Sequence, residues 1–369
     1  MKSLALLLSL FICFSASCQN SFKEMGVKYQ SVINENVAAQ LGMDTTRTHI
    51  RLPNHIVTKN GTILITCDGD NDWGPDHKII LARSTDKGLS WEYSVLKVYP
   101  SNNCIVYDGI NNNVFVFGGK QYIKSCDEGK TWTPAKTLSI EVPEGVEGIM
   151  SSPNNGIQLS NGVLVVPFRG VKMEKGKLVR SVNFVMYSRD YGETWEQSPS
   201  TPLEIMSDEL TVVEYKKNQI MLNTRGGSEQ SWNKTRNGRR VFVQSIKPRN
   251  SKKIWSMAGW KLEPESDGKM WDPICNASLI KAKISRRTVG LFCNCYMPNE
   301  YWPRKNLLLQ FSKDFIHWHP IGYLTPKDKV VYGYCSLWCI NGKITFCYED
   351  IKEGIMYADI TSLIDEELK

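Results

Sequence analysis

Beyond its first twenty residues this chain has no apolar run long enough to cross a bilayer. It also has no basic tract beyond short pairs such as Arg239-Arg240 and Lys252-Lys253. Its 45 Lys+Arg and 38 Asp+Glu residues give a net charge of +7, and the two signs are mixed along the chain. Nucleic acid is therefore not an expected partner. The composition, 41% hydrophobic and 22% charged, is not that of a disordered chain. Its 369 residues are enough for two average domains or one large repetitive β fold.

Cysteines are present but lack the spacing of a metal site or a disulfide framework. Nine follow residue 18, an odd number, and no two of them form a C-x-x-C pair. They are Cys67, Cys104, Cys126, Cys275, Cys293, Cys295, Cys335, Cys339 and Cys347. We expect buried thiols that pack as small hydrophobic side chains, and no bound metal.

The N-terminus has the pattern of a secretory signal peptide. Lys2 precedes an apolar run from Leu4 to Phe14 that is too short for a stable transmembrane span, and small residues follow at 15–17. We expect residues 1–17 to be removed. Small residues before Cys18 also resemble a bacterial lipoprotein cleavage site, although Ser15 stands where leucine is usual. The protein is therefore predicted to be exported, either simply secreted or, with Cys18 as a lipidated first residue, tethered in the periplasm or to the outer membrane.

Turn signals and aromatic residues predict a chain that is mostly β. Eleven Trp and fifteen Tyr favour strands. Apolar segments flank the dipeptides Asn60-Gly61, Asn161-Gly162 and Asn341-Gly342. Asn-Gly suits a type I′ turn because both central residues need positive φ, so each dipeptide predicts a tight hairpin. No long amphipathic helix is indicated, and a helix of one or two turns is expected in the tail, residues 359–369.

A second pattern recurs at longer spacing. It reads S-x-D-x-G-x-(S/T)-W at 84–91, 125–132 and 188–195, with a worn copy at 312–318 that lacks the glycine. Its Asp and Ser side chains suit bonds to a turn backbone, its glycine suits positive φ, and its Trp packs beneath. The aspartates lie 41, 63 and 124 residues apart. Repeats at this spacing predict a propeller of radially arranged sheets, and about 350 mature residues at roughly 60 per unit give six blades.

This pattern is the Asp box, and three intact copies with one decayed copy resemble the sialidase (neuraminidase) superfamily. The resemblance implies an all-β fold, a six-bladed β-propeller over residues 25–369. In that family the boxes lie on blade turns away from the active site, so Asp86, Asp127 and Asp190 are not expected to be catalytic. Asp boxes also occur in unrelated propellers, so they predict the fold more strongly than the activity.

Three arginines stand in segments that resemble the family's carboxylate-binding triad. Arg51 lies in I-R-L-P, which is similar to (F/Y)-R-I-P; Arg225 ends N-T-R; and Arg304 lies in R-K-N-L, which is similar to R-x-N-L. Guanidinium groups bind a carboxylate in a fork geometry that lysine cannot reproduce. The resemblance therefore implies an anionic ligand held by all three.

Two further segments resemble those that carry the family's nucleophile and its base. Tyr334 lies in "YGYCSLW", which is similar to Y-S-(D/x)-L, and Glu209 lies in "MSDELTVVE", which is similar to N-E-x-x-x-V-E. The resemblance makes Tyr334 the nucleophile and Glu209 the group that takes its proton.

The family's acid/base is an aspartate on the loop before the first box. Here that loop, 67–81, holds Asp68, Asp70, Asp72 and Asp76, and Asp72 fits the spacing best. Asp76 is the alternative, and Asp70 lies within alignment error.

Two positions depart from the family's pattern for contacts near O4 of the sugar. Asp70 stands where many relatives have an arginine, and Asn102 stands where they have an acidic residue. Both remain candidate substrate-binding residues, and both leave the identity of the sugar open.

The leading interpretation is an exported, retaining exo-α-sialidase that acts on sialylated glycans without a metal or organic cofactor. One alternative is a hydrolase of another 2-keto-3-deoxy ulosonic acid, deaminated or shorter. A second is a propeller that binds acidic glycans without cleaving them, which would need the arginines but neither Tyr334 nor Glu209. A scaffold for protein partners would need none of these residues.

Overall fold

The computed structural model describes residues 22–45, 49–69, 77–99, 102–226, 239–255, 259–262, 270–284, 287–297 and 302–368. Strands make up about half of this part of the chain and helices only a small share, so the all-β prediction is confirmed. The described helices are α1 (Glu35–Gln40) and α3 (Thr361–Glu367), and α3 confirms the helix expected in the tail. Neither helix is long and apolar enough to span a membrane, nor is any other helix of the described residues.

The described strands form six antiparallel sheets, of which the first three follow one another along the chain. The first contains β2 (Arg51–Val57), β3 (Ile63–Gly69), β4 (Lys78–Ser84) and β5 (Glu92–Leu96). The second contains β6 (Cys104–Asp108), β7 (Asn113–Gly118), β8 (Gln121–Ser125) and β9 (Lys136–Thr137). The third contains β10 (Gly148–Ser151), β12 (Leu164–Glu174), β13 (Lys177–Ser188) and β14 (Glu196–Gln197), with β11 (Ile157–Gln158) paired to β12.

The remaining three sheets complete the set. The fourth contains β15 (Leu210–Lys216), β16 (Gln219–Thr224), β17 (Arg240–Ser245) and β18 (Lys261–Leu262). The fifth contains β19 (Ser278–Ile284), β20 (Arg287–Cys295), β21 (Leu307–Ser312) and β22 (His319–Tyr323). The sixth contains β23 (Val331–Ile340), β24 (Lys343–Asp350), β25 (Gly354–Asp359) and β1 (Gln30–Ile33).

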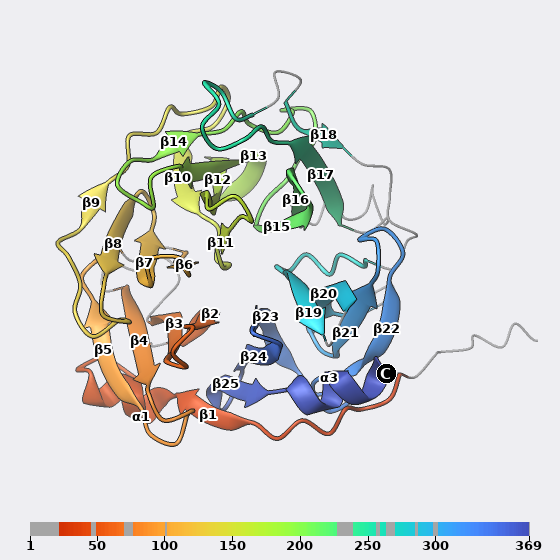
Figure 1. The fold of residues 1–369 in the computed structure, drawn as a ribbon. Coiled ribbons are helices and arrows are strands. Elements are labelled where there is room, and N and C mark those ends of the chain that lie inside the picture. Colours follow the sequence, from red (N-terminus) through yellow and green to blue (C-terminus); the bar gives the residue numbers. More distant parts are fainter. Residues whose placement is uncertain are drawn as a thin grey trace, which may run out of the picture.

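The six sheets are arranged in a ring around a common centre (Figure 1). The first and last parts of the chain meet in one of them, because β1 pairs antiparallel with β25 through Gln30 opposite Tyr357. The ring is therefore closed by hydrogen bonds between strands about 320 residues apart in sequence, as expected of radially repeated sheets.

The core lies between neighbouring sheets. One cluster joins Phe115 and Phe117 of β7 to Phe168 of β12 and Phe184 of β13, and the rings of Phe117 and Phe168 meet edge to face at 6.3 Å between centroids. Each such side chain contributes about 1.5–3 kcal/mol when removed from water. Packing between sheets, added to pairing within them, fixes how each sheet faces the centre.

The four Asp boxes form the turns that lead into the last strand of their sheets, as the sequence predicts. In the first, Ser84 Oγ donates to Asp86 Oδ1 at 2.8 Å, and the backbone N–H of Ser90 donates to the same oxygen at 2.9 Å. Gly88 has a φ of 90°, and the same bonds recur around Asp127 and Asp190. In the worn copy Phe315, directly after Asp314, has a φ of 65°, as Lys87 does after Asp86 at 64°, and His317 contacts Asp314.

All three Asn-Gly hairpins are present, but the predicted type I′ turn is wrong for two of them. Asn341 and Gly342 both have positive φ, 49° and 81°, as type I′ requires. At Asn60-Gly61 and Asn161-Gly162 only the glycine does. There the loop has three residues, with Gly61 N–H donating to the Thr58 carbonyl and Thr58 N–H to the Thr62 carbonyl. Glycine then occupies the left-handed position that closes a three-residue turn.

The expectation of buried thiols holds for most of the nine cysteines after residue 18, all of which are free in the described residues. Seven are buried, Cys339 is half-buried and Cys126 is exposed.

Candidate active site

A pocket of about 710 Å³ opens where the inner strands converge. Its lining combines charged and polar side chains with an apolar stretch from β10, β12 and β13. The lining residues are Leu52, Asp68, Asn102, Glu147, Gly148, Met150, Arg169, Val171, Met173, Leu178, Asp208, Glu209, Arg225 and Tyr334. Its volume lies within the range of small-molecule binding sites.

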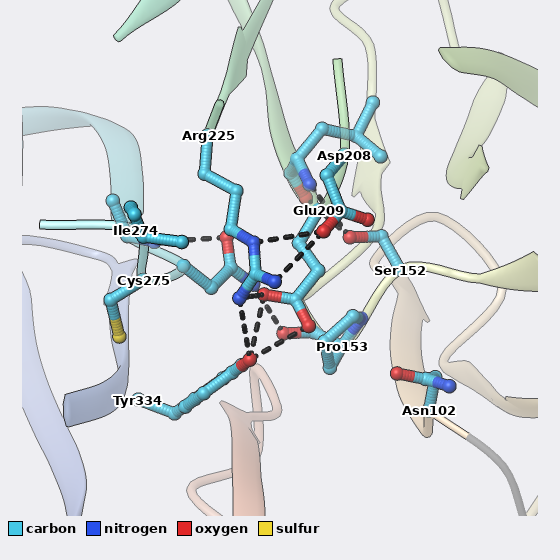
Figure 2. A network of polar contacts seen from close by, with 12 residues as sticks. Asn102, Ser152, Pro153, Asp208, Glu209, Arg225, Ile274, Cys275 and Tyr334 are labelled. Carbon is cyan, nitrogen blue, oxygen red and sulfur yellow. Dashed lines mark hydrogen bonds and ion pairs between the residues drawn. The ribbon is translucent and has the colours of Figure 1, made fainter. Parts of the chain in front are cut away.

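Tyr334 and Glu209 meet in this pocket. The Tyr334 hydroxyl lies 2.7 Å from each carboxylate oxygen of Glu209, and both side chains are buried (Figure 2). Glu209 directly precedes β15, whereas Tyr334 lies in β23, where the strand register shifts between Val331 and Cys335. Burial raises the pKa of Tyr334 well above its ordinary value, and Glu209 raises it further while Arg225 opposes it. The resting phenol is therefore neutral and donates its proton toward Glu209.

The structure brings the three predicted arginines around this tyrosine. Arg225 Nη1 lies 3.1 Å from the Tyr334 hydroxyl. The guanidinium carbons of Arg51 and Arg304 lie 5.4 and 5.7 Å from the centre of the Tyr334 ring. Three positive groups from different sheets thus surround one phenol, which favours an anion at this point.

Arg51 is held by a carboxylate that the sequence analysis did not identify. Its Nε and Nη2 donate to the two oxygens of Glu349 at 3.0 and 3.4 Å. Glu349, on β24, also accepts from the backbone N–H groups of Leu52 at 2.9 Å and Tyr334 at 3.0 Å. Leu52 has a φ of 57° beside an irregularity in β2, and this bend allows its N–H and the Arg51 side chain to reach the same carboxylate.

Arg304 has a different environment. Its Nη1 and Nη2 donate to the backbone carbonyls of Tyr332 at 2.9 Å and Ile274 at 2.6 Å. Its Nε is buried and has no hydrogen-bond partner within the described part of the chain. Among those residues, no carboxylate forms an ion pair with Arg304, so its charge is the least compensated of the three.

Arg225 has the opposite environment, because two adjacent carboxylates bind it. Its Nε and Nη2 contact Asp208 Oδ2 at 2.9 and 2.8 Å, and its Nη1 contacts Glu209 Oε2 at 2.8 Å (Figure 2). Two backbone hydrogen bonds between residues 208–209 and Arg225 extend the β15–β16 ladder and fix this arrangement.

Asp208 has a second guanidinium partner, Arg169, which the sequence analysis also missed. Arg169 lies in β12, contacts Asp208 Oδ1 through Nη1, and donates from Nη2 to Asn102 Oδ1 at 3.3 Å. Burial raises the pKa of Asp208, but Arg169 and Arg225 outweigh burial and hold this pKa below its ordinary value. A charged residue inside the otherwise apolar stretch 163–171 was the available signal for Arg169.

Asn102, which stands where the family pattern has an acidic residue, lines the pocket. Its backbone N–H donates to Asp68 Oδ2 at 3.1 Å, and its Nδ2 contacts the sulfur of Met150 at 3.1 Å. Asp68 itself is buried and also contacts His77 Nε2 at 3.0 Å.

Asp70, Asp72 and Asp76 lie outside the described residues. Within the described ranges, no three His, Cys, Asp or Glu side chains gather as metal ligands would.

Comparisons with known proteins agree with this fold. The model of a family described as a BNR repeat-like domain matches residues 9–292. A sialidase of Bacteroides fragilis is 25% identical over 366 residues, which cover 86% of this chain and 61% of that protein. A sialidase of Clostridium perfringens is 24% identical over 204 residues, which cover 44% of this chain and 52% of that one.

Two solved structures show the same architecture at low identity. A Hadza microbial sialidase superimposes with a TM-score of 0.69 at 18% identity, covering 85% of this chain and 66% of its own. The structure of Trypanosoma rangeli sialidase in complex with sialic acid superimposes with a TM-score of 0.66 at 16% identity. The match covers 94% of this chain and 59% of that one. Together these matches define an all-β, propeller-like protein with Asp-box repeats. The chain belongs to the sialidase superfamily with BNR repeats, and it spans about three fifths of the Bacteroides relative.

Proposed function

We propose that this protein is a retaining exo-α-sialidase that hydrolyses terminal α-ketosidically linked sialic acids. The observation that carries the proposal is the 2.7 Å contact between the Tyr334 hydroxyl and Glu209, with Arg51, Arg225 and Arg304 around it. The curated relatives are sialidases, and one similar structure was solved with sialic acid, which supports the same substrate class here.

The substrate's chemistry explains the choice of tyrosine. The anomeric carbon of a 2-ulosonic acid carries a carboxylate, which would repel an Asp or Glu nucleophile. A neutral phenol approaches without that repulsion and is activated when Glu209 takes its proton. The buried, neutral Tyr334 beside an accepting carboxylate has the required arrangement.

The proposed reaction consists of two displacements at one carbon. The arginines bind the substrate carboxylate, and Tyr334 Oη attacks the anomeric carbon as Asp72 protonates the departing glycosidic oxygen. Asp72 then removes a proton from water, which attacks the same carbon and breaks its bond to Tyr334, while Glu209 returns the proton to the phenol. Two inversions leave the configuration retained.

We also propose that each of the six sheets is one blade of a six-bladed β-propeller, and that residues 25–369 form a single catalytic domain. The signal pattern supports export after removal of residues 1–17, with Cys18 as the candidate lipid attachment point. Mass spectrometry of the mature N-terminus from the native host distinguishes a lipidated Cys18 from simple secretion.

The activity is tested with a fluorescent α-ketoside of N-acetylneuraminic acid. Wild type should release the aglycone, and Tyr334→Phe and Glu209→Gln should each lose at least about 10²-fold in kcat/KM. Tyr348→Phe is the matched control, because this buried tyrosine of the same sheet donates toward Asp350 instead of Glu209. Wild type without turnover, or Tyr334→Phe with full turnover, would contradict the proposal.

The acid/base is tested by comparing leaving groups. An acid that protonates the leaving oxygen matters most when that oxygen is strongly basic. Asp72→Asn should therefore impair hydrolysis of a sialyl-galactoside far more than that of an activated aryl ketoside. If Asp76→Asn or Asp70→Asn shows this pattern instead, the acid is reassigned to that residue.

A second candidate substrate is another 2-keto-3-deoxy ulosonic acid. The observation that favours it is the pairing of Asn102 with Arg169 where relatives have an acidic contact. A panel of deaminated and eight-carbon glycosides separates the two candidates by their kcat/KM values.

A further inference from the structure

The fork of Arg225 is already occupied by the protein's own carboxylate. A guanidinium group has five N–H donors, and a carboxylate ligand needs two that point in parallel. The Nε and Nη2 edge of Arg225 faces Asp208 at 2.9 and 2.8 Å. The Nη1 group contacts Glu209 at 2.8 Å and the Tyr334 oxygen at 3.1 Å. These partners take four of the five donors, so no parallel pair is left.

Asp208 differs from the carboxylate that binds Arg51. Glu349 is held by two backbone N–H groups in addition to Arg51, so that pair is a fixed support. The side-chain contacts of Asp208 in the described structure are with guanidinium groups, Arg225 on one oxygen and Arg169 on the other. If Arg225 turned to another carboxylate, Arg169 would still neutralise Asp208, so Asp208 would not become an unpaired buried charge.

We propose that Asp208 competes with the ligand's carboxylate for Arg225, and that Arg169 is the partner that retains Asp208 when the ligand displaces it. This inference rests on the proposed function, because it assumes that the ligand is an acidic sugar. In the N-E-x-x-x-V-E pattern, Asp208 stands at the position of the neutral asparagine. The chain therefore carries one negative charge more at its anion site than that pattern does, and the affinity for acids is lower as a result.

The test separates the ligand's charge from its shape. Isothermal titration with N-acetylneuraminic acid and with its methyl ester measures both affinities for wild type and Asp208→Asn. We expect Asp208→Asn to bind the acid about ten-fold or more tightly than wild type, and to bind the ester within about two-fold of wild type. Glu353→Gln, which removes one charge from an exposed residue that does not line the pocket, should change neither affinity beyond about two-fold.

The outcomes distinguish this inference from the proposed function. Acid binding that is unchanged or weaker in Asp208→Asn would overturn competition, and so would an equal change for acid and ester, which indicates a structural role. If neither protein binds either probe, the proposed function and the competition both fail.

A second variant tests the partner role of Arg169. In Arg169→Met, Arg225 is the one cation among the described residues that still pairs with Asp208, so the two should pair more firmly. We expect acid binding to weaken by about ten-fold while ester binding changes little. Acid binding equal to that of wild type would overturn the role of Arg169. Circular dichroism of both variants establishes that they are folded before titration.

Discussion

The backbone N–H of Tyr334 donates a 3.0 Å hydrogen bond to Glu349 Oε1. Because the same carboxylate binds Arg51 Nε at 3.0 Å, one buried side chain fixes both the strand that carries the phenol and an arginine beside its ring. The proposed nucleophile and one member of the arginine set therefore share a supporting carboxylate on β24.

Glu349→Gln should weaken this arrangement without leaving a cavity. The amide keeps the side chain's shape but loses its charge and one acceptor, so the free energy of unfolding should fall by about 1–3 kcal/mol. The KM for a sialoside should rise because Arg51 is no longer held. Urea unfolding and steady-state kinetics measure both effects. Glu353→Gln, at an exposed position beyond β24, should change neither. An unaltered KM in Glu349→Gln would show that Arg51 is held by other contacts.

Gly333 allows close packing directly beside the site. Its φ is 105°, and a Cβ there would lie 2.7 Å from Arg304 Cδ and 2.9 Å from Cys275 Sγ. Gly333→Ala should therefore displace Arg304 or Tyr334, cost about 1–3 kcal/mol in stability and sharply reduce kcat/KM. Gly342→Ala is the matched control: it has a φ of 81° on the same sheet, but its nearest neighbour is 3.9 Å away. It should lose stability alone, by about 1–2 kcal/mol. Equal kinetic losses in the two variants would contradict the steric explanation.

Asp190 should be important for stability but not for chemistry. Its carboxylate accepts from Ser188 Oγ at 2.8 Å and Thr194 N–H at 2.9 Å, within a turn that does not line the pocket. Asp190→Ala should lower the free energy of unfolding by about 1–2 kcal/mol and leave kcat/KM within about two-fold. Thermal unfolding and the aglycone assay test this together, and a large loss of kcat/KM at an unchanged melting temperature would assign Asp190 a role that the structure does not support.

The pKa of Asp208 predicts a pH dependence of stability. Arg169 and Arg225 hold this pKa below the ordinary value of 3.8 in the folded protein. The unfolded chain therefore takes up the proton more readily, and the stabilisation that Asp208 contributes above this value is lost as the pH falls. Between about pH 4 and pH 2, the free energy of unfolding should fall less steeply for Asp208→Asn than for wild type. Denaturant titrations across this range measure both slopes, and parallel slopes would contradict the prediction.

Local sequence was sufficient to predict the features that depend on a few neighbouring residues. The Asp boxes and the Asn-Gly hairpins are short turns whose hydrogen bonds close within about five residues, so their patterns are visible in the sequence. The turn type at Asn60 could not be predicted, because two-residue and three-residue loops share the same dipeptide and the strand register selects between them.

The parts of the site that the sequence did not reveal are contacts between neighbouring sheets, made by residues that lie far apart in sequence. Glu349 meets Arg51 across 298 residues, and Arg169 meets Asp208 across 39. Neither partner stands in a recognisable motif, since a carboxylate on an inner strand has no local pattern that says which arginine it binds. The candidate site residues could be found because each lies in a short segment that resembles a family motif. Their supporting partners are brought to them only when the sheets close into a ring.

The central claim is that Tyr334 forms a covalent bond to the sugar, and trapping tests it most directly. Trypanosoma rangeli sialidase, which is similar to this chain in fold, was solved as a covalent intermediate with 2,3-difluorosialic acid. Wild-type protein incubated with that reagent should gain one sugar adduct by intact-mass spectrometry, and peptide mapping should place it on Tyr334. Tyr334→Phe should remain unlabelled, while Tyr348→Phe should be labelled like wild type. An adduct on another residue, or hydrolysis of a sialoside with no adduct at all, would contradict the account.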